Sequence, residues 1–323
     1  MINFNLIRPA DQAAALAASA HGTYIAGGTD LMQLMKDRIE APSTLIDLDG
    51  IVPETIIATG DGLRIAAHAR MSDAAGHPLI AHDYPVIAQA LLLSASPQVR
   101  NMATVGGNLL QRTRCGYFRD TGFPSCNKRL PGTGCGAIDG ENRMLAILGT
   151  SEHCIATNAS DFAVALATLD ASLVLATAGG ERTVKLTDFY REPGDTPHIE
   201  TVLRPGELIR EIVVPAAPLN KASNYVKVRD RATFEWAVVS AAVAMTVDNG
   251  RISAARVAVG GVGTKPWRSP AAEAVLVGQA PSDELFAQAG ETAVQGAKPR
   301  SENGFKIVLA SRTVARALSA LKA

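Results

Sequence analysis

The sequence predicts an α/β domain followed by a smaller α+β domain, and three observations carry this prediction. In the first third of the chain, short β-rich runs alternate with segments of helical periodicity. The segment PAAPLN, residues 215–220, then interrupts this pattern. Beyond it, two long apolar runs flank Asp248-Asn249-Gly250, a strong hairpin signal, and helical patterns follow only after them. We therefore place the domains at residues 1–217 and 218–323.

The α/β domain is predicted to begin with short strands and helices. Its first strands are expected where β-rich runs end at Gly or Asp or lead into a helix: Thr23–Ile25 and the runs that begin at Thr44 and Gly62. The amphipathic segment Leu31–Lys36 follows the first of them. Residues 83–96 predict a longer helix, because Pro85 suits its first turn and Pro97 ends it. A loop is expected to begin at Pro97.

Regular periodicity is lost between residues 111 and 153, where Gly, Pro, Asn and Arg dominate. This pattern is typical of an ordered insertion, whose order has to come from something other than an apolar core. We place the insertion at about residues 111–155. After it, Ser160 can cap a helix that starts at Asp161. The remaining strands of this domain are predicted in the runs SLVLAT, RTVKL and GELIREIVVP.

The C-terminal domain is predicted to be an antiparallel sheet with its helices grouped after the strands. The strands are expected in YVKVRD, WAVVSAAVAMTV and RISAARVAVGGVG. Three helices follow, and the last is expected from about Asn303 to Leu321. This order of elements indicates an α+β domain.

Composition excludes two classes of partner. The 323 residues include 31 basic and 31 acidic side chains, so the chain has no electrostatic footprint for nucleic acid. Its longest apolar stretch, near residues 237–247, is too short for insertion into a membrane. The N-terminal residues lack the basic, apolar and small-residue regions of a signal peptide. The chain alone is therefore expected in the cytoplasm, unless a partner carries it elsewhere.

A glycine pair in Ala26-Gly27-Gly28-Thr29-Asp30 lies between a predicted strand and a predicted helix. Adjacent glycines let backbone N–H groups approach an anion, and the Thr29 hydroxyl can donate to the same oxygens. Taken alone, the motif favours a simple strand-to-helix turn, and Asp30 suits such a helix start. It is not the GxGxxG motif, so no Rossmann fold follows from it.

A second glycine pair occurs in the segment TVGGN, residues 104–108. Asn108 offers an amide that both donates and accepts hydrogen bonds, which suits the edge of a heteroaromatic ring. By itself this segment is again a turn. Two such loops in one domain nevertheless favour a large polyanionic cofactor.

All four cysteines lie in one 40-residue window of the insertion: Cys115, Cys126, Cys135 and Cys154. The spacing C-x10-C-x8-C-x18-C lacks the tight pairs of most zinc sites, and disulfides are disfavoured in a reducing cytosol. Four thiolates meet the ligand count of a [4Fe–4S] cluster, which a wrapping loop can hold. The residues favour the cluster and leave zinc, or thiols without a metal, as alternatives.

Five basic residues lie close to these cysteines in the sequence: Arg112, Arg114, Arg119, Lys128 and Arg129. A cluster with four thiolates is anionic. We therefore expect these cations to offset its charge and to lower the pKa of the thiols.

The motifs together resemble the FAD-binding subunit of the xanthine dehydrogenase family of molybdenum hydroxylases. The resemblance covers nearly the whole chain and is carried, in the family's order, by IAGGTDL, ATVGGNL, SD at Ser160, KVRDR and GGVGTKPWR. Most members lack a cysteine insertion, but 4-hydroxybenzoyl-CoA reductases and three-subunit bacterial periplasmic aldehyde oxidoreductases have one. The insertion is similar to that of the aldehyde oxidoreductases, chiefly through CNKRLPG.

The resemblance implies a two-subdomain α/β FAD module of the vanillyl-alcohol-oxidase type, followed by the α+β domain. It implies that the FAD pyrophosphate lies on the backbone of nine residues: Ala26, Gly27, Gly28, Thr29, Asp30, Leu31, Met32, Gln33 and Leu34. Thr104, Gly107 and Asn108 would face the flavin and its phosphate arm. None of the six histidines lies in either glycine segment, so non-covalent FAD is expected.

Three further residues are assigned by the resemblance. Asp161 would hydrogen-bond the cofactor, Lys227 would lie near the isoalloxazine, and Ile209 would make an apolar contact to the adenine or flavin. From the residues alone, Asp161 is a helix N-cap partner and Lys227 is a solvated strand end.

The resemblance also implies a role. In such enzymes the substrate is oxidised at a molybdopterin cofactor on a large subunit, and electrons pass through [2Fe–2S] clusters on a small subunit to FAD and then to an external acceptor. The chain would be the electron-transfer subunit of a heterotrimeric aldehyde oxidoreductase, with no catalytic residues of its own. In this branch the small subunit carries a twin-arginine signal, which predicts co-export to the periplasm.

Two alternatives to this role stay open. One is the β subunit of a 4-hydroxybenzoyl-CoA reductase, in which electrons run in the opposite direction. The other is a zinc-stabilised binding protein without redox activity.

Overall fold

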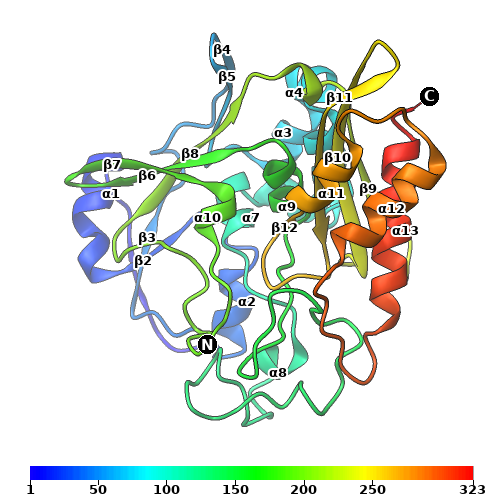
Figure 1. Ribbon diagram of the computed structural model, residues 1–323. Coiled ribbons are helices and arrows are strands. Elements are labelled where there is room, and N and C mark those ends of the chain that lie inside the picture. The colour runs from blue at the N-terminus through cyan, green and yellow to red at the C-terminus, as the bar shows by residue number, and fades with distance from the viewer. Residues whose placement is uncertain (323) are drawn as a thin grey trace.

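The computed structural model describes residues 1–322, and its strands form three sheets (Figure 1). A parallel sheet has the order β1 (Asn5–Ile7), β3 (Thr44–Asp47), β2 (Thr23–Ile25). An antiparallel sheet has the order β4 (Ile56–Thr59), β5 (Gly62–Ala66), β8 (Leu208–Pro215), β6 (Ser172–Thr177), β7 (Gly180–Lys185). The C-terminal antiparallel sheet has the order β12 (Trp267–Arg268), β11 (Arg251–Gly260), β10 (Val239–Asp248), β9 (Ser223–Val228).

Short helices connect these strands. The helices before residue 217 are α1 (Gln12–Ala18), α2 (Leu31–Lys36), α3 (Met71–Gly76), α4 (Pro78–Asp83), α5 (Pro85–Leu92), α6 (Pro97–Met102), α7 (Val105–Leu109), α8 (Gly116–Arg119), α9 (Asp161–Thr168) and α10 (Leu186–Phe189). The later helices are α11 (Pro270–Leu276), α12 (Asp283–Ala293) and α13 (Phe305–Ser319). Single 3₁₀ turns occur at Ser19–His21 and Pro218–Asn220.

The C-terminal sheet confirms the hairpin and the helix order expected from the sequence. Asn249 and Gly250 have φ values of 51° and 75°, the positive values that a tight hairpin between β10 and β11 requires. Helix α13 buries Val314 and Leu318 in the domain core. Figure 1 shows α12 and α13 side by side next to this sheet, so the apolar face of the sheet is covered.

The segment after Pro97 differs from the expected loop. Pro97 occupies the first turn of α6, whose N-cap Ser96 accepts a hydrogen bond from the Val99 N–H. Proline lacks an N–H but has a helical φ, so it begins a helix as readily as it ends one. The second glycine pair lies inside α7, capped by Thr104. The expectation of a loop here is therefore wrong.

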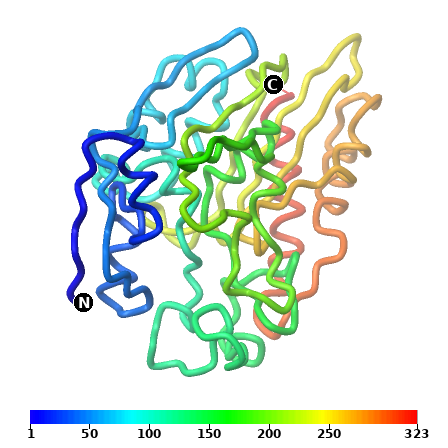
Figure 2. Tube along the Cα trace, turned by 90° about the vertical axis from the view of Figure 1, so that its left-hand side faces the viewer, coloured from blue at the N-terminus to red at the C-terminus, as the bar shows by residue number. Residues whose placement is uncertain are grey.

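The insertion, residues 111–155, contains one short helix, α8, and otherwise irregular chain. Figures 1 and 2 show it projecting at the lower end of the molecule, near α2 in Figure 1. Buried Lys306 of α13 holds its far end, donating to the carbonyls of Leu145 at 3.0 Å and Gly261 at 2.8 Å. Contacts with the C-terminal domain therefore help to order the insertion. None of the helices within residues 1–322 has the length and hydrophobicity of a membrane-spanning segment.

Candidate functional site

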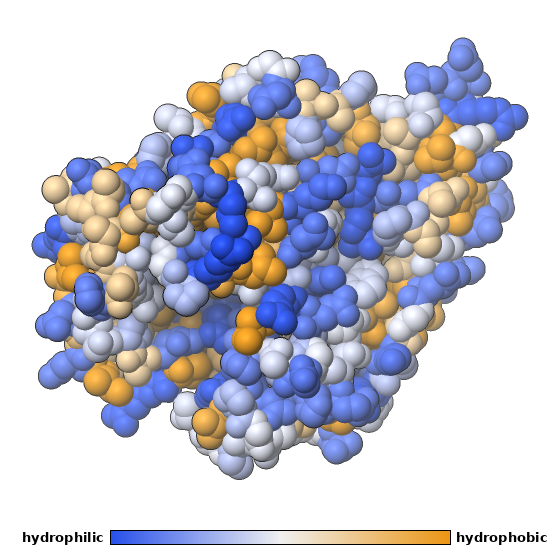
Figure 3. All heavy atoms as spheres, turned by 60° about the vertical axis from the view of Figure 1, so that its left-hand side comes forward, coloured by the Kyte–Doolittle hydropathy of each residue, from blue (hydrophilic) through white to orange (hydrophobic). Residues whose placement is uncertain are grey.

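A cleft of about 480 Å³ lies between the β2–α2 segment, helix α7, strand β8 and the loop that follows β9. The face in Figure 3 is hollowed near its centre, where hydrophobic and hydrophilic residues both border the hollow. The cleft brings together every cofactor residue expected from the sequence except Met32: Ala26, Gly27, Gly28, Thr29, Asp30, Leu31, Gln33, Leu34, Thr104, Gly107, Asn108, Asp161, Ile209 and Lys227. Residues more than 200 positions apart thus line one site.

The first glycine segment presents a row of backbone donors. Among the described residues, the N–H groups of positions 26–31 find no hydrogen-bond acceptor. Gly28 has a φ of 68°, which side-chain-bearing residues rarely adopt, and a Cβ at Gly27 would lie 1.9 Å from the carbonyl oxygen of Met102. Both positions therefore require glycine, and the row of N–H groups can bind an anion.

The second glycine segment has a different construction. The N–H of Gly106 donates to the carbonyl of Ala67, that of Gly107 to the Thr104 hydroxyl, and that of Asn108 to the Thr104 carbonyl. The Asn108 side chain accepts from the Ser160 hydroxyl at 2.6 Å. These donors are used internally, so the expectation of two glycine loops of one kind is wrong. The segment contributes surface to the cleft, while the first segment contributes free donors.

A buried ion pair lies at the wall of the cleft. Lys227 donates to Asp161 at 2.8 Å, and their side chains are only 1% and 6% exposed. Tyr225 donates to the other carboxylate oxygen at 2.5 Å, and Ser94 contributes a third hydrogen bond at 3.1 Å. Burial and the adjacent Asp161 carboxylate raise the pKa of Tyr225 well above its ordinary value. Lys227 is therefore not a solvated strand end: its charge is held in place by Asp161.

Replacing Asp161 with alanine should destabilise the chain, because Lys227 then stays buried without its counterion. We expect the free energy of unfolding to fall by about 3 kcal/mol or more. Denaturant unfolding of FAD-free protein measures this loss without a contribution from the cofactor. Asp161→Leu combined with Lys227→Met removes both charges and should recover part of the stability. A double variant no more stable than Asp161→Ala would contradict this account.

Several residues of the cleft were not expected from the sequence. His68, whose side chain is buried, lines it beside Ala67. Phe234 and Trp236 reach it from the loop after β9, and Arg114 lies over the Trp236 ring at 5.1 Å. The adjacent KVRDR motif, from Lys227, is the only sequence signal that pointed to this loop.

The four cysteines belong to one cluster of packed apolar side chains, here called the cysteine pocket, and none is in a disulfide. The N–H of Ala156 donates to the Cys154 sulfur at 3.5 Å, and the backbone N–H groups of Phe118 and Tyr117 near Cys115 act to lower the pKa of its thiol. Burial raises the pKa of Cys115 to about 12 and that of Cys154 to about 11. The insertion therefore gathers three buried cysteines and the half-buried Cys135, with backbone N–H groups near the sulfurs.

The basic residues near the cysteines do not act as expected. Burial has the largest effect on the pKa of Cys115 and of Cys154 and raises both. Of the five cations, only Lys128 lowers one of these pKa values, that of Cys154. The arginines have carboxylate or carbonyl partners instead. Arg112 binds Glu40 and Glu200, and Arg129 donates to backbone carbonyls such as Tyr117 at 2.6 Å. In the metal-free protein, the predicted lowering of a thiol pKa by these cations is found only as the effect of Lys128 on Cys154, where burial outweighs it.

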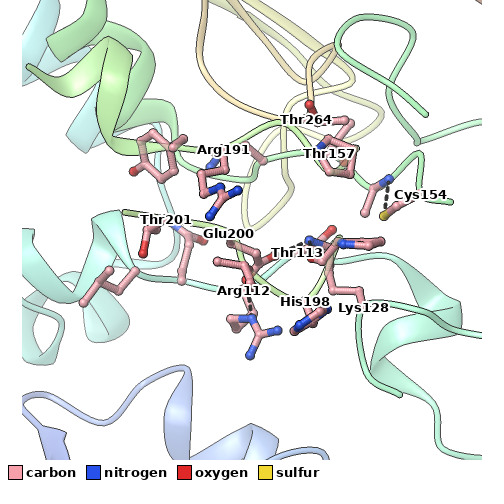
Figure 4. Close-up of a pocket in the computed structure, with 18 of the residues that line it drawn as sticks. Arg112, Thr113, Lys128, Cys154, Thr157, Arg191, His198, Glu200, Thr201 and Thr264 are labelled. Carbon is pink, nitrogen blue, oxygen red and sulfur yellow. Dashed lines mark hydrogen bonds and ion pairs between the residues drawn. The ribbon is translucent and has the colours of Figure 1, made fainter. Parts of the chain in front are cut away.

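A smaller cavity of about 210 Å³ adjoins the cleft at Arg112 and reaches Cys154. Figure 4 shows Arg112, Lys128 and Glu200 around it, with the Cys154 sulfur at one end. Glu200 binds both cations, accepting from Lys128 at 2.6 Å. The cavity therefore adjoins both the cleft and Cys154, and the ion-paired side chains of Arg112, Lys128 and Glu200 line it.

Metal-ligating side chains are tightly grouped at another position. Within residues 1–322, only Asp49, Glu54 and His68 bring three ligand atoms within 4.8 Å of one another. Arg70 already binds the Asp49 oxygen at 2.6 Å, and His68 lies 3.3 Å from the same atom. This group is satisfied by an ion pair. In the same described residues, no three of the four cysteine sulfurs all lie within 4.8 Å of one another.

Family comparisons match both parts of the chain. The FAD binding domain in molybdopterin dehydrogenase matches residues 2–217, and the CO dehydrogenase flavoprotein C-terminal domain matches residues 224–321. The chain belongs to the FAD-binding subunits of the molybdenum hydroxylase family. The free N–H groups of residues 26–31, in a cleft large enough for an extended ligand, fit the diphosphate of FAD.

Known relatives of this FAD-binding subunit agree with that assignment. The aldehyde oxidoreductase FAD-binding subunit PaoB of Escherichia coli (strain K12) is 49% identical over 319 residues, covering 98% of this chain and 96% of its own. The carbon monoxide dehydrogenase medium chain of Hydrogenophaga pseudoflava is 27% identical, covering 92% and 88%. The solved structure of carbon monoxide dehydrogenase from that organism matches with a TM-score of 0.76 at 27% identity, covering 100% of this chain and 99% of its own. The family expected from the sequence is confirmed.

Proposed function

We propose that this chain is the FAD-binding electron-transfer subunit of a molybdenum-dependent aldehyde oxidoreductase. The row of free N–H groups at residues 26–31 carries the proposal, because it offers the cleft several donors for one diphosphate. The 49% identity to the Escherichia coli subunit favours an aldehyde oxidoreductase over a 4-hydroxybenzoyl-CoA reductase. FAD supplies the redox chemistry when bound, and the chain supplies binding, orientation and electrostatics.

We propose a position in the cleft for each part of FAD. The backbone of residues 26–34 holds the diphosphate in a module of the vanillyl-alcohol-oxidase type. Thr104, Gly107 and Asn108 face the flavin side, and Ile209 offers an apolar contact. Asp161 and Lys227 form a fixed charge pair at the wall, which lies on the flavin side in this arrangement.

We further propose that Cys115, Cys126, Cys135 and Cys154 hold one [4Fe–4S] cluster. A tetrahedral zinc site has Zn–S bonds of about 2.3 Å, which places its sulfurs about 3.8 Å apart. No three of these cysteines meet even a 4.8 Å limit in the part of the chain that the structure describes. A four-iron cluster fills the space between its thiolates, so the wider spacing and the N–H groups directed at the sulfurs favour it over zinc.

The partners are proposed from the family. A molybdopterin-binding large subunit and a [2Fe–2S] small subunit would deliver electrons to FAD, and an external acceptor would remove them. A small subunit with a twin-arginine signal would carry the folded chain to the periplasm. In cells that lack that signal, fractionation should then find this chain in the cytoplasm.

A visible spectrum with metal analysis tests the proposal. Protein purified under anaerobic conditions should show flavin bands with a broad iron–sulfur shoulder and contain about four iron atoms and four labile sulfides per chain. Zinc without iron would overturn the cluster while leaving FAD in place. Absence of flavin from protein that folds normally would overturn the electron-transfer role.

A further inference from the structure

Asp30 joins the proposed diphosphate segment to the cysteine insertion. Its carboxylate accepts from the Arg112 N–H at 2.8 Å, from the Arg119 guanidinium at 2.8 Å and from the Arg114 guanidinium. The Asp30, Arg114 and Arg119 side chains are only 16%, 21% and 16% exposed. Asp30 makes no side-chain cap on α2, so its carboxylate is committed to the insertion.

The arginines in turn shape the start of the insertion. Arg119 also donates to the carbonyls of Thr113 at 2.8 Å and Arg112 at 3.0 Å, which closes the chain around Asp30. Arg112 and Arg119 both lie over the Phe118 ring, at 4.7 and 5.9 Å from its centre. The ring packs in the same buried cluster as Cys115. The conformation of residues 112–119, which include Cys115, therefore depends on the Asp30 carboxylate.

Helix α2 makes a second contact with the insertion, through Leu34. Leu34 of α2 lines the cleft and is also buried in the cysteine pocket with Cys115 and Cys154. Helix α2 is only six residues long, with Asp30 as its N-cap and Leu34 in its middle, so one short helix carries both contacts with the insertion. Burial alone would raise the pKa of Asp30, but Arg114, Arg119 and the Arg112 N–H outweigh it and hold that pKa below its ordinary value. Asp30 is therefore charged when it binds the arginines.

We propose that Asp30 is a positioning residue that couples FAD binding to the order of the cysteine insertion. The proposal deepens the proposed function, because it assumes that FAD lies on residues 26–34. Holding the carboxylate toward the arginines fixes the neighbouring N–H groups in the orientation that binds the diphosphate. This coupling is reciprocal. If the ordered insertion strengthens FAD binding by a given factor, FAD binding stabilises the ordered insertion by the same factor.

Arg119→Gln is the decisive variant, because Arg119 binds Asp30 but does not line the cleft. We expect it to weaken FAD binding about tenfold, measured by flavin fluorescence during titration of FAD-depleted full-length protein. Amide exchange in residues 112–130 should increase as well, and adding FAD should reduce that exchange in the unmodified protein. Arg119→Lys, which keeps the charge, should restore most of the affinity.

Arg300→Gln is the matched control. Arg300 also ties the insertion to the remainder of the chain, through Glu152 at 2.8 Å, but it has no contact with Asp30. It should leave FAD affinity unchanged. Asp30→Asn should weaken FAD binding as Arg119→Gln does. The double variant should bind FAD no more weakly than Asp30→Asn, because both substitutions disrupt the same Asp30–Arg119 ion pair.

Two outcomes would overturn the coupling: FAD affinity in Arg119→Gln equal to that of the unmodified protein, or FAD addition that leaves exchange in residues 112–130 unchanged. These readouts use FAD and amide exchange and so do not require iron. Failure of the proposed cluster would appear separately, as missing iron in unmodified protein. Failure of FAD binding itself would appear as no titration in any variant, and it would overturn both proposals.

Discussion

Cys126→Ser is expected to remove the cluster and to destabilise the whole insertion. The cysteine pocket is a small apolar group of residues within an otherwise irregular segment, so we expect its folding to depend on the proposed cluster. We expect iron to fall from about four atoms to below about one per chain, and the Tm to fall by about 10 °C. Metal analysis and thermal unfolding measure the two effects on the same preparation.

Ser125→Ala is the control for this variant, because Ser125 adjoins Cys126 and its side chain makes no hydrogen bond among the described residues. It should keep both its iron and its Tm. A Cys126→Ser protein that loses iron but unfolds at the same temperature would show that the cluster is not structural. Retention of about four iron atoms would show that Cys126 is not a ligand.

Gly28→Val is expected to abolish FAD binding. A φ of 68° strains a β-branched residue by about 1–3 kcal/mol, and its Cβ would lie 3.2 Å from the Met32 side chain. The chain must therefore move where residues 26–31 present their donors. The purified variant should contain flavin in fewer than about one chain in ten, because loss of several shared hydrogen bonds exceeds the 1.4 kcal/mol that a tenfold change requires. Absorbance after denaturation measures the flavin released per chain.

Two variants separate backbone strain from a direct clash with the ligand. Gly60→Val lies in an exposed turn, where a Cβ meets nothing within 4 Å, and should retain full flavin. Asparagine tolerates a positive φ, so Gly28→Asn should keep the fold. If Gly28→Asn also loses flavin, the side chain itself obstructs the diphosphate. Full flavin in Gly28→Val would show that the segment is only a turn.

Local signals in the sequence predicted many elements correctly. Asn249-Gly250 forms the expected hairpin, and Ser160 accepts from the Ala163 N–H at 3.0 Å as the cap of α9. Both features depend on residues within four positions of one another, where side-chain chemistry decides the backbone angles directly. The helices at residues 97–109 were missed because Pro97 and the glycine pair of α7 suit helix starts and loops alike.

The sequence by itself determined which residue types were available for chemistry: two glycine pairs, four clustered cysteines and the motifs of a flavoprotein family. Only the tertiary structure decided what each charge binds. Arg114 and Arg119 lie within four residues of Cys115, yet both guanidinium groups bind Asp30, more than 80 positions away in the chain. Local sequence cannot specify such a pair, because it forms only when packing removes both groups from water and brings distant segments together.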